Sequence, residues 1–243
     1  MPNSEESFID RTQKGHAILN AVSGFTPAYS PPDNAINVAK FTLFMNEVDS
    51  ANEAVATADT AYSNAVTTRK TASDAAQKLT TRVVNFVAAG PVWKLEFPRI
   101  KELADKVRRI KPPRKTPPPP ILPPGTPPPP PEKPRDRGDG SYAEIAANFK
   151  TLAEAVNALV GYSAPGTDID GPALTALAGQ LEGNNGAVGT TDTALDRAQR
   201  ARVEIFYAPE SGLEDKFQAI KKAVKGQYGQ SSTQYAQVKG IKW

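Results

Sequence analysis

The sequence has no cysteine and only one histidine, His16, among its 243 residues. Without cysteine the chain forms no disulfide and offers no thiolate as a nucleophile or metal ligand. A single histidine excludes a metal site built from several histidines, and it is the only histidine base available to a hydrolytic triad. His16 lies within an expected helix, so we interpret it as a structural residue.

Common nucleotide-binding and hydrolase motifs are also missing. The sequence contains no Walker loop, no G-x-G-x-x-G and no G-x-S-x-G. Asp168 and Asp170 precede Gly171 as at the start of a calcium loop, but the rest of that motif is absent. Asp59 and Asp192 lie in expected helices, and they would serve a pocket only if both were buried. We therefore expect no enzyme, no catalytic residue, no cofactor and no metal site.

Long apolar runs and an export signal are absent as well. No run approaches the roughly 18 apolar residues that a membrane-spanning helix needs. The first eleven residues carry three acids and lack a basic segment followed by an apolar one. We expect a cytoplasmic protein by default, with non-classical export left open. The net charge of +3 is too small to indicate an anionic partner.

Proline, in contrast, is abundant, with 23 residues. Two dense runs lie within residues 112–140, where proline fixes φ and removes backbone N–H donors, so neither a helix nor a sheet interior accommodates them. Polyproline II is the expected conformation. We predict a proline-rich linker over 112–140 between a first helical bundle, 1–111, and a second, 141–243.

Both flanking regions show helical spacing and helix-ending signals. In the first, we expect helices from residues 4 to 23, 34 to 71, 72 to 89 and 98 to 110, with Gly90-Pro91 ending the third. In the second, Ser141 and Glu144 have the spacing of a capping box. Helices are expected there from 141 to 160, 172 to 207 and 213 to 228, with a short last helix capped by Ser231. Gly183 and the residues after it weaken the long helix.

The two regions also resemble each other in sequence at a constant offset of 133 positions, as from Ala54 to Ala187. Such self-similarity indicates a repeated structural unit. The last residues of the two copies are also alike after a small change of register. The identical pairs are Tyr29/Tyr162, Ser30/Ser163, Pro32/Pro165, Ile36/Ile169, Thr42/Thr175, Asn52/Asn185, Ala54/Ala187, Val55/Val188, Thr57/Thr190, Asp59/Asp192, Thr60/Thr193, Ala61/Ala194, Ala65/Ala198 and Arg69/Arg202.

These patterns together predict an all-α protein made of two homologous three- or four-helix bundles, a tandem duplication joined by a polyproline II linker. Alanine supplies much of the 39% hydrophobic content and aromatics only 7%, which favours cores formed by close helix approach. The segments Phe206–Leu213 and Tyr235–Lys242 resemble the tails of uncharacterised bacterial helical proteins. That resemblance implies a bacterial origin, and it indicates nothing about mechanism because no activity is attached to those proteins.

The candidate interaction residues are proline and basic side chains in and beside the linker. Arg114-x-x-Pro117-x-x-Pro120 and Pro128-x-x-Pro131-x-Lys133 fit the two orientations of a proline-rich ligand. Basic residues from Arg99 to Lys115, diluted by two acids, are able to contact phosphates. The full candidate set is Pro117, Pro118, Pro119, Pro120, Pro127, Pro128, Pro129, Pro130, Pro131, Arg108, Arg109, Arg114 and Lys115.

Three functions fit this sequence. The favoured one is a non-catalytic scaffold that self-associates or bridges protein partners, because a duplicated unit presents two similar surfaces. The first alternative is a basic module for nucleic acid or another anionic surface, and a further one is a proline-rich ligand for a separate recognition domain. A pocket protein or enzyme is the least favoured reading.

Overall fold

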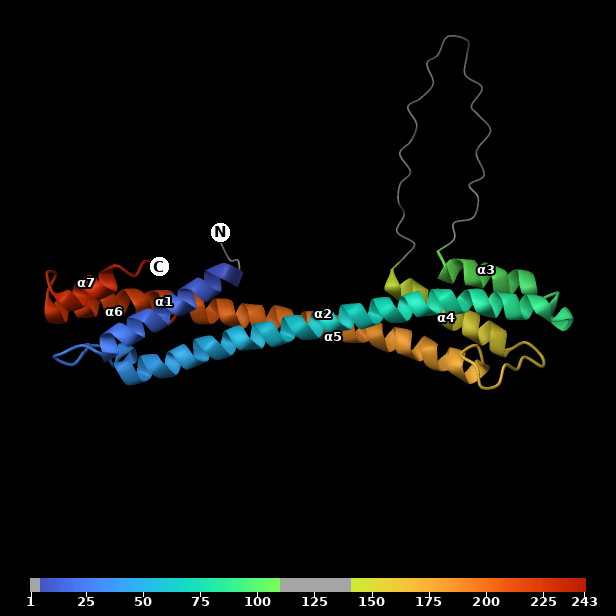
Figure 1. The fold of residues 1–243 in the computed structure, drawn as a ribbon, viewed down its shortest axis with the longest axis horizontal. Coiled ribbons are helices and arrows are strands. Elements are labelled where there is room, and N and C mark those ends of the chain that lie inside the picture. Colours follow the sequence, from blue (N-terminus) through green and yellow to red (C-terminus); the bar gives the residue numbers. More distant parts are fainter. Residues whose placement is uncertain (1–4, 110–140) are drawn as a thin grey trace, which may run out of the picture. The chain divides into compact units, whose positions relative to one another are not determined.

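The computed structural model describes residues 5–109 and 141–243. Within those two ranges the protein is all-α, with seven α-helices, two short 3-10 helices and no strand (Figure 1). The predicted linker, including both proline runs, Arg114 and Lys115, lies outside the described residues. In the ranges that are described, no helix is long and apolar enough to cross a membrane.

The first region contains α1 (Glu5–Ser23), η1 (Asn34–Ile36), α2 (Val38–Ala89), η2 (Pro91–Trp93) and α3 (Phe97–Val107). The predicted stop at Gly90-Pro91 is confirmed, since α2 ends at Ala89. The predicted boundary between residues 71 and 72 is wrong, because α2 runs through it as one helix. Residues 38–89 contain neither glycine nor proline, so nothing in the local sequence interrupts the backbone hydrogen bonds.

The second region contains α4 (Tyr142–Asn157), α5 (Gly171–Tyr207), α6 (Leu213–Tyr228) and α7 (Thr233–Lys239). The predicted capping box is present: the Ser141 hydroxyl accepts from the Glu144 backbone N–H, and the Glu144 carboxylate accepts from the Ser141 N–H. The α7 cap is Ser232 rather than the predicted Ser231. Glycines in α5 do not interrupt it, although each one disfavours a helix by roughly 1 kcal/mol relative to alanine.

A break between α5 and α6 sets the second region apart from the first. Pro209 follows the end of α5, and Gly212 caps α6. A Cβ on Gly212 would lie 2.8 Å from the backbone N and O of Ala208, so this tight turn requires glycine. The equivalent stretch of the first region lies within the continuous helix α2.

The chain folds into two compact units that do not follow the predicted boundaries at 111 and 141. Unit 1 comprises Met1–Ser63 and Thr190–Trp243, and unit 2 comprises Asn64–Gly189. Each unit therefore combines residues from both halves of the chain, where the sequence suggested two successive bundles. The physical reason is that the apolar residues of α2 and α5 are divided between two different cores.

The core of unit 1 joins the start of the chain to its end. Residues of α1 and the first part of α2 pack with residues from the end of α5, from α6 and from α7, and α1 contacts both α6 and α7 (Figure 1). Phe8 and Phe206 meet edge to face with ring centroids 4.9 Å apart. The fully buried large side chains of this core are Phe8, Ile18, Phe41, Met45, Phe206, Leu213 and Phe217.

The core of unit 2 joins the end of the first half to the start of the second. The last part of α2 and all of α3 pack with α4 and the first part of α5, and α3 lies against α4. Phe149 is fully buried there and is surrounded largely by aliphatic side chains and alanines. Phe86, Trp93 and Tyr162 pack against this core as a partly exposed aromatic group.

Candidate interaction site

Two residues of the predicted basic site, Arg108 and Arg109, lie within the described part of the chain. Arg108 is committed to the protein itself, since its guanidinium is 2.8 Å from Asp105 Oδ1 and donates to the Thr81 hydroxyl at 3.4 Å. Arg109 is exposed, and its guanidinium carbon lies 5.9 Å from the ring centroid of Tyr142. These contacts use both arginines to hold α3 against its neighbours.

The rest of α3 carries charges of both signs. Lys106 pairs with Glu102 at 3.0 Å, whereas Arg99 and Lys101 are exposed. A surface on which basic and acidic side chains alternate presents little net potential to a phosphate backbone. The described part of the predicted basic cluster is therefore a mixed-charge helix surface.

The acidic and histidine candidates do not converge. His16 Nε2 lies 3.0 Å from Asp49, and both side chains are on the surface of unit 1. Asp168 pairs with Arg82. Asp59 and Asp192 are both exposed, which removes the condition on which the pocket hypothesis depended. In the ranges 5–109 and 141–243, no three His, Asp or Glu side chains gather as a metal site would require.

A shallow depression does exist in unit 2, beside the start of α5. It is lined by Asn157, Tyr162, Asp170, Pro172 and Thr175, among others. The Asn157 amide donates to the Thr175 hydroxyl at 3.1 Å, and the Tyr162 hydroxyl donates to the Ile169 carbonyl at 2.6 Å. Burial, and secondarily the nearby Asp170, raises the pKa of Tyr162 to about 12. These polar groups are engaged with one another, so the depression offers few free donors to a ligand.

An exposed apolar patch is the most unusual surface feature of unit 2. It consists of Val92, Leu95 and Val160, which are 79%, 92% and 89% exposed. Val92 and Leu95 belong to the short connection between α2 and α3, and Val160 follows α4. Isolated exposed leucines are ordinary on protein surfaces, but Val92 and Leu95 lie within two residues of Trp93 in the sequence, and the Val160 carbonyl accepts a hydrogen bond from the Trp93 indole. Exposed aliphatic side chains that gather around one residue in this way indicate an interaction surface.

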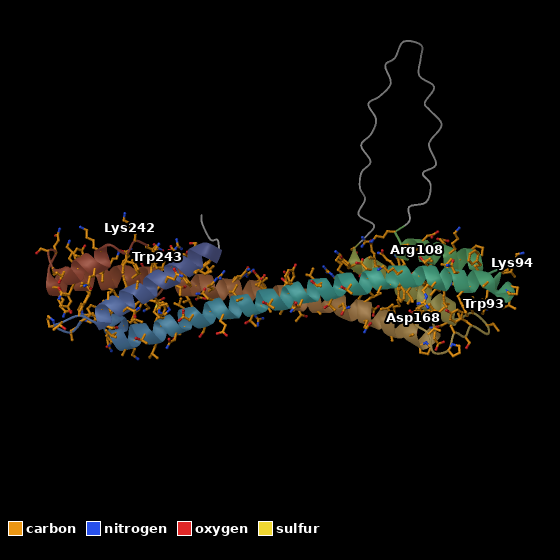
Figure 2. The ribbon with its side chains drawn as sticks, in the orientation of Figure 1. Trp93, Lys94, Arg108, Asp168, Lys242 and Trp243 are labelled. Atoms are coloured by element: carbon orange, nitrogen blue, oxygen red, sulfur yellow. The ribbon has the colours of Figure 1, made fainter. Side chains whose placement is uncertain are left out.

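Trp93 holds the two parts of this patch together. Its indole Nε1 donates to the carbonyl of Val160 at 2.9 Å, and its ring centroid lies 5.7 Å from that of Tyr162. A Cβ on Gly90 would lie 2.3 Å from the Trp93 ring, so glycine is what allows the indole to fold back onto the backbone. Figure 2 shows Trp93 and Lys94 at the connection between α2 and α3.

The charges beside the patch balance. Lys94 and Glu96 are both exposed and flank Leu95 in the sequence. An apolar centre with a rim carrying both signs of charge is the usual composition of a protein–protein interface, in which the apolar centre is desolvated. The arrangement suits a protein partner better than a polyanion.

Sequence reasoning missed this patch. In the sequence, Val92, Trp93, Lys94 and Leu95 fall between two expected helices, and Val160 is the last residue of another expected helix. The available signal was the presence of the apolar residues Val92 and Leu95 in a short connection between two helices. Which of them face water depends on the Trp93–Val160 contact, and these residues lie 67 positions apart.

Comparisons with protein-family models, with curated proteins and with solved structures found no match to this chain.

Proposed function

We propose that this chain is a non-catalytic scaffold protein that self-associates or bridges protein partners. The single observation that carries the proposal is the apolar patch of Val92, Leu95 and Val160. Leaving this much aliphatic surface in water has a free-energy cost of about 25 cal/mol per Å². A protein partner that covers the patch removes that cost.

The proposal includes the duplication, because several contacts recur at the predicted offset. Arg69 and Arg202, 133 positions apart, each place the guanidinium over an aromatic ring of the other half: Tyr142 at 4.3 Å and Phe8 at 4.0 Å. The carbonyls of Pro27 and Val160, also 133 positions apart, accept hydrogen bonds from Tyr228 and Trp93. A doubled gene gives this correspondence a simple origin.

The helix boundaries support the same interpretation. Val38, where α2 begins, and Gly171, where α5 begins, are separated by 133 positions. Ile36 and Ile169, an identical pair, are both buried just before these helices. A second identical pair lies within these helices: Val55 in α2 is 3% exposed and Val188 in α5 is 8% exposed. Two copies of one unit are expected to bury the same positions.

Self-association is tested by light scattering coupled to size exclusion, over a range of protein concentrations. The wild-type chain is expected to exceed the 26.0 kDa of a monomer, and Leu95→Asp combined with Val160→Asp is expected to return it to that mass. Leu43→Asp is the matched control, since Leu43 is 57% exposed and lies in unit 1. A strictly monomeric wild-type chain would contradict self-association.

The basic-module alternative has a separate test. Nucleic-acid affinity is measured at low salt for the wild type and for Arg99→Glu combined with Lys101→Glu, which reverses two exposed cations of α3. A polyanion-binding protein would lose affinity with both added salt and charge reversal. We expect no binding that depends on these residues. The proline-rich ligand alternative rests on residues outside those that the structure describes and stays a prediction.

A further inference from the structure

The two halves of the chain do not contain separate cores. The buried first-half residues from Phe8 to Val48 pack in a cluster with residues 206–238, and those from Ala76 to Val107 pack in a cluster with residues 145–181. If residues 5–109 were removed from residues 141–243, both clusters would be opened to water. A fully buried leucine, isoleucine or phenylalanine side chain contributes roughly 1.5–3 kcal/mol by its burial, so the interface between the halves is the main stabilising element.

In unit 1 the contacts between the halves are specific as well as apolar. Gln227 donates from its amide nitrogen to the Ala28 carbonyl at 2.8 Å and accepts from the Ser30 N–H at 2.9 Å. The Tyr228 hydroxyl donates to the Pro27 carbonyl at 2.7 Å, and its ring lies 5.4 Å from that of Phe25. The end of α6, in the second half, therefore binds the loop around residues 27–30 of the first half.

In unit 2 the roles of the halves are exchanged. The end of α2 and the connection after it belong to the first half, and they bind the loop between α4 and α5 of the second half. Trp93 donates to Val160, and Phe86 meets Tyr162 edge to face with ring centroids 5.5 Å apart. Arg82 pairs with Asp168. The start of one half therefore binds the end of the other half twice, once in each unit.

An interface in which each partner offers the same two surfaces is self-complementary, as in a two-fold symmetric dimer. We propose that residues 5–109 and 141–243 are non-covalent partners, and that the corresponding half of a second copy of this chain takes the same place. The partner is thus a second copy, and the mode of association is exchange of halves. This goes beyond the proposed function, because it uses the two cores and does not involve the patch of Val92, Leu95 and Val160.

The test begins with the full chain, carrying a protease site inserted within residues 112–140 and cut after folding. The two fragments are expected to remain together at the mass of the uncut chain in native mass spectrometry and size exclusion. Separation of the fragments under native conditions overturns the proposal. A full chain that is strictly monomeric contradicts both self-association through the patch and exchange of halves. An oligomer that survives Leu95→Asp combined with Val160→Asp contradicts the patch alone, and separation of the cut fragments contradicts the pairing alone, so the two failures are distinguishable.

Exchange is tested by mixing cut protein with cut protein of higher mass, uniformly labelled with a heavy isotope. After unfolding in urea and dilution, about half of the complexes are expected to combine a light half with a heavy half, as random pairing requires. Recovery of parental pairs alone overturns the exchange. Aggregation or separated fragments after dilution also overturn the proposal, because the halves would then be insufficient partners for one another.

A matched pair of substitutions shows whether the cores are the interface. Phe8→Ala removes a ring that contacts Phe206 of the other half, whereas Ile9→Ala alters a neighbour that is 55% exposed. The linker keeps the halves at high effective concentration in the uncut chain. In the cut protein Phe8→Ala is expected to raise the dissociation constant by about 100-fold or more, and Ile9→Ala by a few-fold at most. Equal effects of the two substitutions would contradict pairing through the cores.

Discussion

Units 1 and 2 share several contacts between the halves of the chain, but their cores differ. Unit 1 is rich in buried aromatic side chains, among them Phe8, Phe41, Phe206 and Phe217. In the cluster of unit 2 described here, Phe149 is the one aromatic residue in the buried set, and alanines such as Ala76, Ala104 and Ala153 fill much of the rest. Alanine lets helix backbones approach closely, and large rings fill a wider space. The two units therefore use different packing solutions.

The comparison also distinguishes contacts that occur in both units from features that occur in only one half of the chain. The arginine over an aromatic ring and the hydrogen bond to the inter-helix loop occur in both units. The continuity of the long helix does not, since α2 runs unbroken where Pro209 and Gly212 interrupt the second half. These two contacts between the halves therefore recur, whereas the continuity of the long helix differs.

The largest expected effect comes from emptying each core in turn. Phe206→Ala in unit 1 and Phe149→Ala in unit 2 both remove a ring with no exposed surface, and each is expected to lower the free energy of unfolding by about 3–5 kcal/mol. Trp243 belongs to unit 1 and Trp93 to unit 2. Urea unfolding followed by tryptophan fluorescence in Trp93→Phe and Trp243→Phe backgrounds therefore reports the units separately. If either substitution shifted the urea midpoint reported by Trp93 and the one reported by Trp243 equally, the two units would unfold as one.

A smaller effect is expected at the two arginine–ring contacts. Arg202 is 4% exposed, while Arg69 is only partly buried. A desolvated cation over a ring is worth about 2 kcal/mol and a more exposed one about 0.5–1 kcal/mol. Double-mutant cycles with Phe8→Leu and Arg202→Met, and with Tyr142→Leu and Arg69→Met, measure the two coupling energies in urea unfolding. Coupling in unit 2 as strong as in unit 1 would remove burial as the explanation.

Helix caps provide the next comparison. Ser141→Ala removes the hydroxyl that accepts from the Glu144 N–H in the α4 capping box of unit 2, and it leaves the backbone N–H that donates to the Glu144 carboxylate. The substitution is expected to destabilise the protein by about 1 kcal/mol. Ser232→Ala removes the single side-chain bond that caps α7 in unit 1, from the Tyr235 N–H at 3.1 Å. Its expected cost is lower, since α7 is a short helix. Thermal unfolding of both variants gives the order, and a larger loss for Ser232→Ala would contradict it.

The smallest effect at neutral pH concerns the equivalent tyrosines Tyr29 and Tyr162. Burial raises the pKa of Tyr162 to about 12, and burial together with Tyr228 and Asp33 raises the pKa of Tyr29 further. The unfolded chain, with tyrosine pKa values near 10, releases these protons first as the pH rises. The stability present below about pH 10 is therefore lost as the pH rises toward the folded pKa values.

Thermal unfolding from pH 8 to pH 12 measures this dependence. Tyr162→Phe is expected to flatten the alkaline loss of stability in unit 2, and Tyr29→Phe to flatten it in unit 1. Tyr228→Phe serves as a comparison, since burial also raises the pKa of Tyr228 although its hydroxyl, which donates to the Pro27 carbonyl, is largely exposed. An unchanged alkaline profile in Tyr162→Phe would show that the hydroxyl ionises as readily in the folded protein as in the unfolded chain.

Most helix ends were predictable because their causes are local. Gly90-Pro91 ends α2, Ser141 and Glu144 begin α4, and Pro209 follows α5. Each of these signals acts within a few residues, through φ restriction or a side-chain cap. The false boundary at residues 71 and 72 arose where no such signal exists and only the apolar pattern changed.

The candidate site was not predictable in the same way. Arg108 and Arg109 looked available to a partner, yet Arg108 pairs with Asp105 and both arginines lie against other helices. The exposed patch needed the Trp93–Val160 hydrogen bond, which joins the two halves. A sequence pattern shows that a residue is apolar or charged, and it does not show which distant residue covers it.

The sequence by itself determined the helical class, most helix termini and the similarity of its two halves in sequence, because each of these is read directly from the order of residues along the chain. Only the tertiary structure decided that each half completes the core of the other. An amphipathic helix specifies that one face must be buried, and it does not specify which part of the chain covers that face. Whether a helix packs within its own half or against the other half depends on which residues meet in the folded cores, and here both clusters contain residues of both halves.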